Sequence, residues 1–384
     1  LVDRDPGDGR DGRGMVGAAS GPFGLVPLWY FAPKSIKAWV LLSAAGALAI
    51  LMAAFALADP DNVCVTNGSF MASQIANGLV MGTIYALMAM GLTLIFSILR
   101  LVNFAHGEFY MVGGMSVYYV SAVWLPEMPP AAAVLVACGI TFVIGAAFER
   151  IFLSPMYDSR VERPIGYAVL ATFSLVYFLQ YFVQALAGAT PVKAQRFFDF
   201  PIMRLPSAED PWLIKTSKAN LRLFDTVSVS NPRFTAAAIS VLVLLALLFF
   251  LYRTWWGKAL RAASQDRQAA AVAGIDPDKM SMLAFALGGM LAGLSGAVLV
   301  QAFSWVPQVG LLAALRSGVI VILGGLGSMP GAFVGGIIVG LAEAAGTGCI
   351  PDPQRAASYV PAYGMLILTL TLLLKPTGLF GRRE

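Results

Sequence analysis

Membrane-length apolar runs interrupted by one compact polar turn restrict this chain to few folds. Residues 77–114 read NGLVMGTIYALMAMGLTLIFSILRLVNFAHGEFYMVGG, with apolar sequence on both sides of the turn Asn103-Phe-Ala-His106-Gly107-Glu108. His106 is the only histidine among the 384 residues. Water is scarce at such a depth, so polar groups there must find partners inside the protein. The pattern predicts a chain that crosses a bilayer several times.

The composition supports this prediction. Hydrophobic residues make up 58% of the chain, charged residues only 12%, and the mean hydropathy is +0.75. A soluble domain carries roughly one quarter charged residues. We therefore predict an all-α, polytopic membrane protein that is built against lipid. The net charge of +5 indicates basic cytoplasmic loops rather than nucleic-acid binding.

Ten apolar runs are candidate membrane spans, since a spanning helix needs about 20 mostly apolar residues. The runs at 311–325 and 331–346 are short and rich in glycine, which favours half-helices or a re-entrant pair. We expect about eight to ten transmembrane helices with Gly-rich broken or re-entrant segments. The ten runs are 38–58, 72–98, 107–125, 131–150, 165–187, 234–252, 281–303, 311–325, 331–346 and 359–374.

The spans lie in three predicted regions. Residues 1–36 form a disordered, cytoplasmic N-terminal extension, because they are charged and Gly-rich at their start and lack an apolar period. Residues 37–60 form an extra anchor helix, whose apolar run is too long for a signal peptide. Residues 61–384 form the transmembrane domain. The first methionine is Met15, so either Met15 is the true start or residue 1 comes from an alternative start codon.

Lysine and arginine in the loops place both termini and the 150–163 and 253–280 loops in the cytoplasm. The same alternation places 188–233 outside, although this long segment carries seven basic residues. The three cysteines, Cys64, Cys138 and Cys349, lie far apart in the sequence. Their spacing predicts neither a metal site nor a disulfide framework. The less favoured alternative is a single bridge between Cys64 and Cys349, which could both lie outside.

The 253–280 segment reads RTWWGKALRAASQDRQAAAVAGIDPDKM. It contains a run of helix formers, then Gly274 as a C-cap and Asp276-Pro277 as the start of a new helix. It is either a solvated loop between two spans or a short docking helix for a cytoplasmic partner. Its Ala-rich face would allow close approach.

Four motifs in order resemble the permease subunits of branched-chain (hydrophobic) amino acid ABC importers, a family that includes urea and short-amide importer permeases. The resemblance covers residues 72–381 and implies that 253–280 is the cytoplasmic loop that docks on the ATPase. Residues 188–233 depart from the family, either as a periplasmic insertion or as a contact with a specialised partner. The motifs are NGLVMGTIYALMAMGLTLIFSILRLVNFAHGE, RTWWGKALRAASQDRQAAAVAGI, LGGLGSMPGAFVGGIIVGLAE and KPTGLFGRRE.

ABC importer permeases often carry an EAA-x3-G pattern in that loop. Here the matching residues are Gln268-Ala269-Ala270 and Gly274, with glutamine in place of the usual glutamate and without the later Ile-x-Leu-Pro. The resemblance implies a role in ATPase coupling for Arg261, Asp266, Arg267, Gln268, Ala269, Ala270 and Gly274.

Several polar and glycine residues are candidates for the solute path. The Asn103–Glu108 turn either caps a broken helix, forms a polar constriction, or couples protons through His106. Glu343 is either interfacial or functional, since an ionisable group within a span is a functional suspect. Most glycines indicate tight helix packing, whereas 324–331, with Pro330, is equally a pore-adjacent turn. The candidates are Asn77, Tyr85, Asn103, His106, Glu108, Gly324, Gly325, Gly327 and Glu343.

The resemblance implies a bacterial inner-membrane subunit that pairs with a second homologous permease, two cytoplasmic ABC ATPases and a periplasmic binding protein. The sequence contains no G-x-x-x-x-G-K-[ST] motif, so ATP and Mg²⁺ would be used by the partner ATPases and no cofactor by this chain. Two other classes remain. A stand-alone secondary transporter or channel would need no docking helix, and one histidine without a clustered triad argues against a membrane enzyme.

Overall fold

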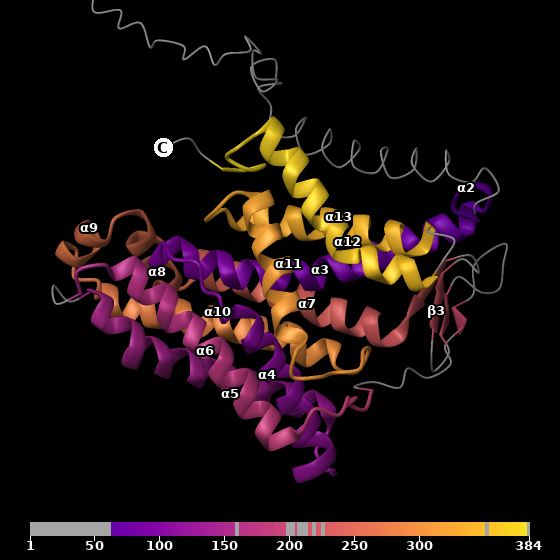
Figure 1. Ribbon diagram of the computed structural model, residues 1–384, viewed down its shortest axis with the longest axis horizontal. Coiled ribbons are helices and arrows are strands. Elements are labelled where there is room, and N and C mark those ends of the chain that lie inside the picture. Colours follow the sequence, from indigo (N-terminus) through magenta and orange to yellow (C-terminus); the bar gives the residue numbers. More distant parts are fainter. Residues whose placement is uncertain are drawn as a thin grey trace, which may run out of the picture. The chain divides into compact units, whose positions relative to one another are not determined.

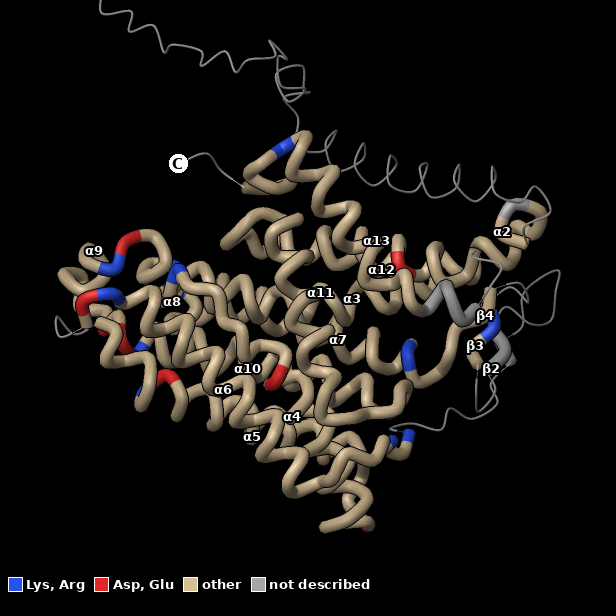
Figure 2. Tube along the Cα trace, in the orientation of Figure 1, with Lys and Arg blue, Asp and Glu red and all other residues tan. Residues whose placement is uncertain are grey.

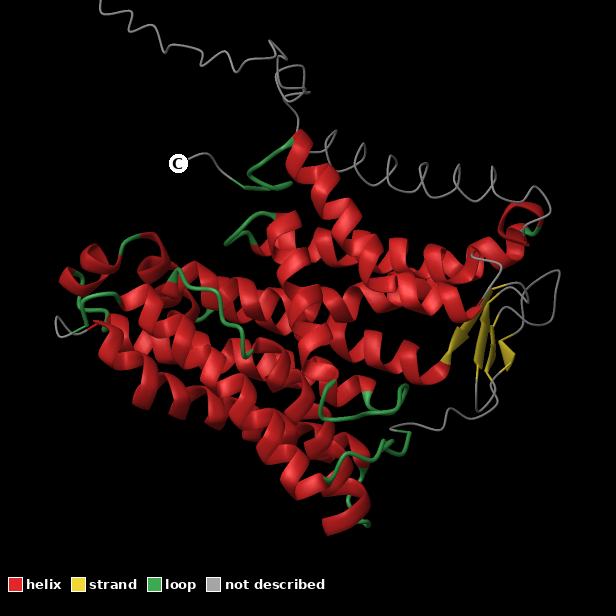
Figure 3. Cartoon of the chain, in the orientation of Figure 1, coloured by secondary structure: helices red, strands yellow, loops and turns green. Residues whose placement is uncertain are grey.

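The computed structural model describes residues 63–157, 161–196, 204–205, 214–216, 220–223, 227–349 and 353–381. The predicted extension at 1–36 and the predicted anchor helix at 37–60 lie outside these residues. The described chain is almost entirely helical, with a few short strands at one end (Figure 3). The all-α prediction is therefore confirmed.

The helices follow the apolar runs of the sequence. Their caps agree with the sequence signals, because Asn67 accepts hydrogen bonds at the start of α3 and Pro130, Pro164 and Pro277 occupy the first turns of α5, α6 and α10. The helices are α2 (Val63–Thr66), α3 (Gly68–Leu99), α4 (His106–Tyr118), η2 (Tyr119–Trp124), α5 (Pro130–Phe148), η3 (Glu149–Leu153), η4 (Ser154–Tyr157), α6 (Pro164–Ala187), α7 (Asn231–Arg253), α8 (Trp255–Gln265), α9 (Arg267–Val272), α10 (Pro277–Leu299), α11 (Val309–Gly324), α12 (Met329–Cys349) and α13 (Pro353–Leu374).

Two predicted spans differ from expectation. Six helices of the described chain are long and apolar enough to cross a membrane, and α12 is one of them. The run at 331–346 is thus a full-length helix, because small residues on both sides extend it to Met329–Cys349. The run at 107–125 instead divides into the 13-residue α4 and the π-helical η2. Only α11, with 16 residues, retains the predicted short length.

The 188–233 segment contains a small antiparallel sheet that the sequence prediction missed. The strands are β1 (Arg204–Leu205), β2 (Ile214–Thr216), β3 (Asn220–Leu223) and β4 (Val227–Ser230), paired in that order. Strand β4 is fastened to the start of α3, since the Asn77 amide donates to the Ser228 carbonyl at 3.1 Å. The strands lie at one end of the helices and α8–α9 at the other (Figure 1).

The core is formed around α3 and α10, whose apolar windows are mostly buried, whereas α6 exposes most of its surface. Charged residues cluster around α8 and α9 and are sparse along the central helices (Figure 2). This distribution fits helices whose exposed faces meet lipid, because unpaired charge is costly there.

Helices α3 and α12 cross at backbone contact through two pairs of glycines spaced four residues apart. Gly78 and Gly82 of α3 face Gly336 and Gly340 of α12, and a Cβ at Gly82 would lie 2.8 Å from the Ile337 Cα. Such small-xxx-small pairs let membrane helices approach closely. The packing interpretation of Gly78 and Gly82 is thereby confirmed.

We predict that Gly336→Ala destabilises the protein, since its Cβ would lie 2.6 Å from the Ala86 amide nitrogen. Overpacking of this kind costs about 1–3 kcal/mol. Gly318→Ala is the matched control, because a Cβ at that helical position meets nothing within 4 Å. The thermal unfolding midpoint in detergent should fall for the first variant only. Equal thermal midpoints in Gly336→Ala and Gly318→Ala would contradict the backbone contact between α3 and α12.

Candidate functional site

A cavity of 470 Å³ opens among the helices at the strand-bearing end of the bundle. We call it the outer cavity. Its wall combines aliphatic and aromatic residues with a few polar groups, as in sites for small organic solutes. It is lined by Gln74, Asn77, Met81 and Tyr85 of α3, Tyr110 of α4, Arg233 of α7, Leu299 of α10, Phe303, Ser304 and Trp305, Val309, Leu312, Ala313 and Arg316 of α11, Gly340, Glu343, Ala344 and Thr347 of α12, and Val360 of α13.

The polar centre of this wall is a buried triad from three helices. The Tyr85 hydroxyl donates to Glu343 Oε2 at 2.8 Å, and Arg316 Nε lies 3.2 Å from Glu343 Oε1. The Arg316 guanidinium also lies 5.4 Å from the centre of the Tyr85 ring. The Glu343 side chain is only 8% exposed, whereas that of Arg316 is 30% exposed. Two partners therefore hold this buried carboxylate, and its cation remains accessible.

A second void continues from the outer cavity but is almost closed. It measures only 10 Å³ and shares Tyr85, Tyr110 and Arg316 with the outer cavity. Leu299 and Ala313 are shared as well, and Ile84, Met88 and Ser295 complete its wall. A void of this size holds about one water molecule at most. The outer cavity is therefore shut at its inner end in this conformation.

The Asn103–Glu108 turn lies away from the outer cavity and begins a broken helix. Asn103 Oδ1 accepts from the Ala105 amide at 3.0 Å, which holds the turn before α4, whereas the first turn of α4 receives no side-chain cap. His106 Nε2 lies 2.9 Å from the Met88 carbonyl, which requires the ring proton on Nε2. Glu108 packs against Gly310 at the start of α11. Asn103, His106 and Glu108 are thus buried at a junction of helix ends.

This junction leaves polar atoms unsatisfied. Within the described part of the chain, Asn103 Nδ2, His106 Nδ1 and Glu108 Oε2 have no hydrogen-bond partner. All three side chains are at most 2% exposed. Neither a constriction nor a proton relay is visible in this conformation, and both roles stay predictions.

The 324–331 glycines form a tight turn against the C-terminal segment. Gly325 and Gly327 have φ values of 101° and 79°, which favour glycine. The Leu379 and Phe380 amides donate to the Leu323 and Gly324 carbonyls at 2.9 Å. Gly324 and Gly325 therefore pack against the C-terminal segment, and Gly324, Gly325 and Gly327 do not line the outer cavity.

The coupling segment, 253–280, forms two short helices at the end of the bundle opposite the strands. Asp266 caps α9 by accepting from the Gln268 and Ala269 amides at 2.8 and 3.0 Å. Gly274 has a φ of 83° and ends the turn after α9, and Asp276 caps α10. Hydrogen bonds from Lys279 hold the pKa of Asp276 below its usual value. The segment is therefore helical, and its docking on a partner stays a prediction.

Arg267 fastens this segment internally. Its guanidinium donates to Asp278 Oδ1 at 2.6 Å and Ser281 Oγ at 3.0 Å, and it stacks 3.7 Å from the Tyr157 ring centre. Arg261 stacks over the Tyr252 ring at 4.6 Å. Gln268 and Ala269 are exposed, Ala270 is buried, and Val272 is 91% exposed at the end of α9. Val272 thus forms an exposed apolar end of the segment, and the contacts of Arg261 and Arg267 hold the rest of the segment in place.

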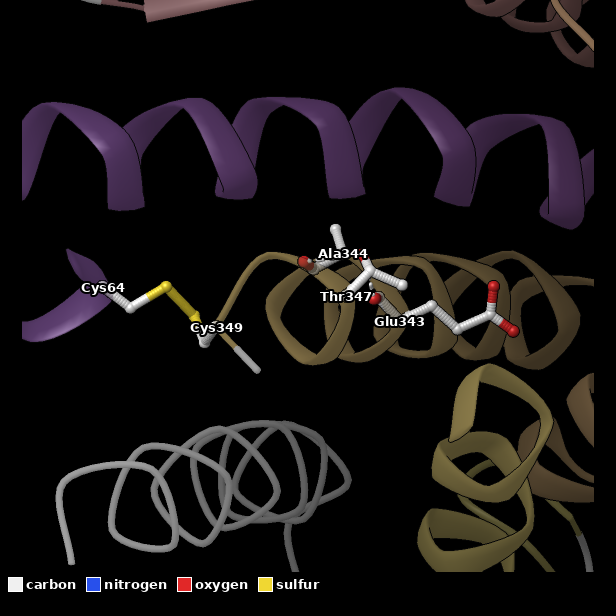
Figure 4. Close-up of a disulfide and its surroundings, with 5 residues drawn as sticks. All are labelled: Cys64, Glu343, Ala344, Thr347 and Cys349. Atoms are coloured by element: carbon white, nitrogen blue, oxygen red, sulfur yellow. Dashed lines mark hydrogen bonds between the residues drawn. A yellow bond between two sulfur atoms is a disulfide. The ribbon is translucent and has the colours of Figure 1, made fainter. Parts of the chain in front are cut away.

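Cys64 and Cys349 form a disulfide, which contradicts the prediction that the cysteines stay unpaired. Their Cα atoms lie 5.4 Å apart although 285 residues separate them in sequence. Sequence spacing could not reveal the pair, because the α3–α12 crossing brings α2 beside the end of α12. Figure 4 shows the bridge on the same helix as Glu343 and Thr347. Cys138 is a free thiol.

We predict that Cys64→Ser lowers the stability of the purified protein. Removing a cross-link that closes a long loop costs about 2–4 kcal/mol, so the thermal midpoint should fall. Cys138→Ser is the control and should leave the midpoint unchanged. Alkylation and mass spectrometry should modify Cys138 alone in the wild type before reduction. Alkylation of Cys64 and Cys349 without reductant would contradict the pairing.

Two arginines and one tyrosine of the cavity wall escaped the sequence analysis. Asn77, Tyr85 and Glu343 were candidates, and the structure brings all three to the outer cavity. Arg233, Arg316 and Tyr110 were missed. Arg316 lies inside the predicted 311–325 span, and an arginine at that depth was a detectable signal.

Comparisons with known proteins identify the class. Residues 74–374 match the family described as the branched-chain amino acid transport system permease component. The high-affinity branched-chain amino acid transport system permease protein LivH of Escherichia coli K12 is 30% identical, over 82% of this chain and 97% of LivH. BraD of Pseudomonas aeruginosa, with the same description, is 30% identical over 81% of this chain and 96% of BraD.

The solved structure of PsaBC from Streptococcus pneumoniae in complex with Fab has a TM-score of 0.41 and 11% identity to this chain. That likeness covers 86% of this chain and 98% of the other. It carries no argument here.

A polytopic helical fold with a solute-sized cavity defines a membrane transport protein. The chain belongs to the branched-chain amino acid transport system permease family. It is a permease subunit of an ABC importer.

Proposed function

We propose that this subunit passes hydrophobic amino acids through the membrane by way of the outer cavity, after delivery by a periplasmic binding protein. The observation that carries the proposal is the combination of one buried ion pair with an aliphatic wall in a cavity of 470 Å³. An amino acid presents two charges and an apolar side chain, and this wall offers a partner to each. The descriptions of LivH and BraD support the same solute class.

The machine we propose contains a second homologous permease, two cytoplasmic ATPases and the binding protein. This chain carries no P-loop motif, so ATP hydrolysis falls to the partners. ATP binding would draw the ATPases together, and their movement would pass through α8 and α9 to the membrane helices. Hydrolysis would reset the path.

The proposed orientation places the bacterial inner membrane around the helices, with both termini and α8–α9 in the cytoplasm. The Cys64–Cys349 disulfide supports it, because disulfides persist in oxidising compartments such as the periplasm. Helix α2, which carries Cys64, and the strands lie at the end opposite α8–α9 (Figure 1). The outer cavity would then open to the periplasmic side.

We predict that Val272→Asp uncouples transport from ATP hydrolysis. Val272 is 91% exposed, and a charge at an apolar contact costs desolvation without a partner. Binding-protein-stimulated ATPase activity in proteoliposomes should fall about tenfold or more, with insertion intact. Lys193→Gln, an exposed change outside the coupling segment, is the control. If Val272→Asp kept full binding-protein-stimulated ATPase activity, the result would contradict a contact between α9 and the ATPase.

The first test of the function is co-expression with the neighbouring genes, followed by purification in detergent. Recovery of a second permease and two ATPases, with ATP-dependent uptake stimulated by a loaded binding protein, would support the proposal. A chain that purifies alone and moves solute into liposomes without ATP would refute it. That outcome would favour a secondary transporter.

A further inference from the structure

The outer cavity holds more positive than negative charge. Its charged lining residues are Arg233, Arg316 and Glu343, and only the last two form an ion pair. Among the described residues, no carboxylate pairs with Arg233. Its guanidinium instead lies 4.9 Å from the centre of the Phe303 ring. A cavity with one surplus cation in a low-dielectric setting favours a solute that brings a carboxylate.

The two members of the ion pair differ in what fixes them. Glu343 accepts from Tyr85 at 2.8 Å and is 8% exposed, so its position is set by α3 and α12. Arg316 is 30% exposed, and its Nε makes no aligned hydrogen bond despite lying 3.2 Å from Glu343. Planar guanidinium groups bind carboxylates best through two parallel bonds. The Arg316 guanidinium is therefore ion-paired, but it still has hydrogen-bonding capacity for a second carboxylate.

Apolar groups surround this charge pair. Leu312 and Ala313 precede Arg316 by about one turn on α11, while Leu299 and Val309 face the same cavity. In a zwitterionic α-amino acid, the carboxylate, the ammonium group and the side chain all leave one carbon. A cation and an anion 3.2 Å apart, beside an aliphatic wall, match that arrangement.

We propose that Arg316 and Glu343 form a binding site for the zwitterionic head group of the solute within the membrane domain. The solute carboxylate binds Arg316 and its ammonium group binds Glu343, so that the ion pair opens by exchange of partners. Arg233 supplies the additional positive charge that draws the carboxylate into the cavity. Tyr85 is a positioning residue that aims Glu343. This inference rests on the proposed function and adds the residues that hold each charge.

Because Arg316 and Glu343 exchange each other for the two charges of the solute, neither has to be buried without a counter-charge when the solute binds. Arg316 and Glu343 each keep a counter-charge before and after the solute enters, which avoids the penalty of an unpaired buried ion. An amine without a carboxylate would leave Arg316 unpaired. A carboxylate without an amine would leave Glu343 unpaired. The site therefore discriminates against both single-charge analogues.

The test uses the complete permease–ATPase complex in detergent without the binding protein, which removes the binding protein's own selectivity. Thermal midpoints are measured with millimolar L-leucine, L-leucinamide or isovalerate. Ligands that bind the native state raise its midpoint. We expect L-leucine to raise it most, isovalerate to raise it less because its carboxylate can pair with Arg233 alone, and L-leucinamide to leave it unchanged. Equal shifts with all three compounds, or none with L-leucine, would overturn the proposal.

Variants assign the shift to these residues. Arg233→Gln breaks no ion pair of the described residues, so the complex should stay assembled and keep its unliganded midpoint. The concentration of L-leucine that gives half the shift should rise about tenfold or more. Arg233→Lys should restore most of the affinity, and Lys193→Gln should resemble the wild type. An unchanged affinity in Arg233→Gln would refute its role.

The double variant Arg316→Gln with Glu343→Gln keeps polar volume and leaves no unpaired charge. We expect it to lose the L-leucine shift while the complex stays assembled. If the double variant kept that shift, the ion pair would only link α11 to α12 and would not bind the solute. ATP-driven uptake of L-leucine by the wild-type complex is measured in parallel. Failure of that uptake would sink the proposed function itself, independently of the head-group site.

Discussion

The glycine contact between α3 and α12 is the constraint on which the rest of the site depends. Tyr85 lies about one turn beyond Gly82 on α3, and Glu343 lies about one turn beyond Gly340 on α12. Because the two backbones touch at these glycines, the Tyr85 hydroxyl reaches Glu343 at 2.8 Å. Any larger residue in the crossing would separate the donor from the carboxylate. The same approach brings Cys64 to Cys349.

The cavity and the coupling segment lie at opposite ends of two rigid helices. Helix α7 carries Arg233 in its first turn and leads through Arg253 directly into α8. Helix α10 starts after α9, at Asp276, and ends at Leu299 in the cavity wall. Each helix has 23 residues, which is about 35 Å of axial length. A displacement of α8–α9 therefore has a direct mechanical connection to the cavity.

The buried polar turn has a different task from the one its composition suggests. Glu108 lies beside the start of α11, and Asn103 Nδ2, His106 Nδ1 and Glu108 Oε2 have no hydrogen-bond partner among the described residues. The His106 bond to the Met88 carbonyl ties that junction to α3, next to the void that closes the cavity. Helix α4 then presents Tyr110 to the cavity. The turn thus supports the wall without facing the solute.

The sequence by itself determined the membrane class, most of the apolar helices, the caps of the 253–280 segment and the family. Those properties depend on hydropathy, period and short motifs, which are local. It also yielded Asn77, Tyr85 and Glu343, because polar residues within apolar runs stand out. Only the tertiary structure decided that Arg233 and Arg316 join them and that Cys64 meets Cys349. Such pairings join segments far apart along the chain, and their geometry is set by helix crossings that no local pattern records.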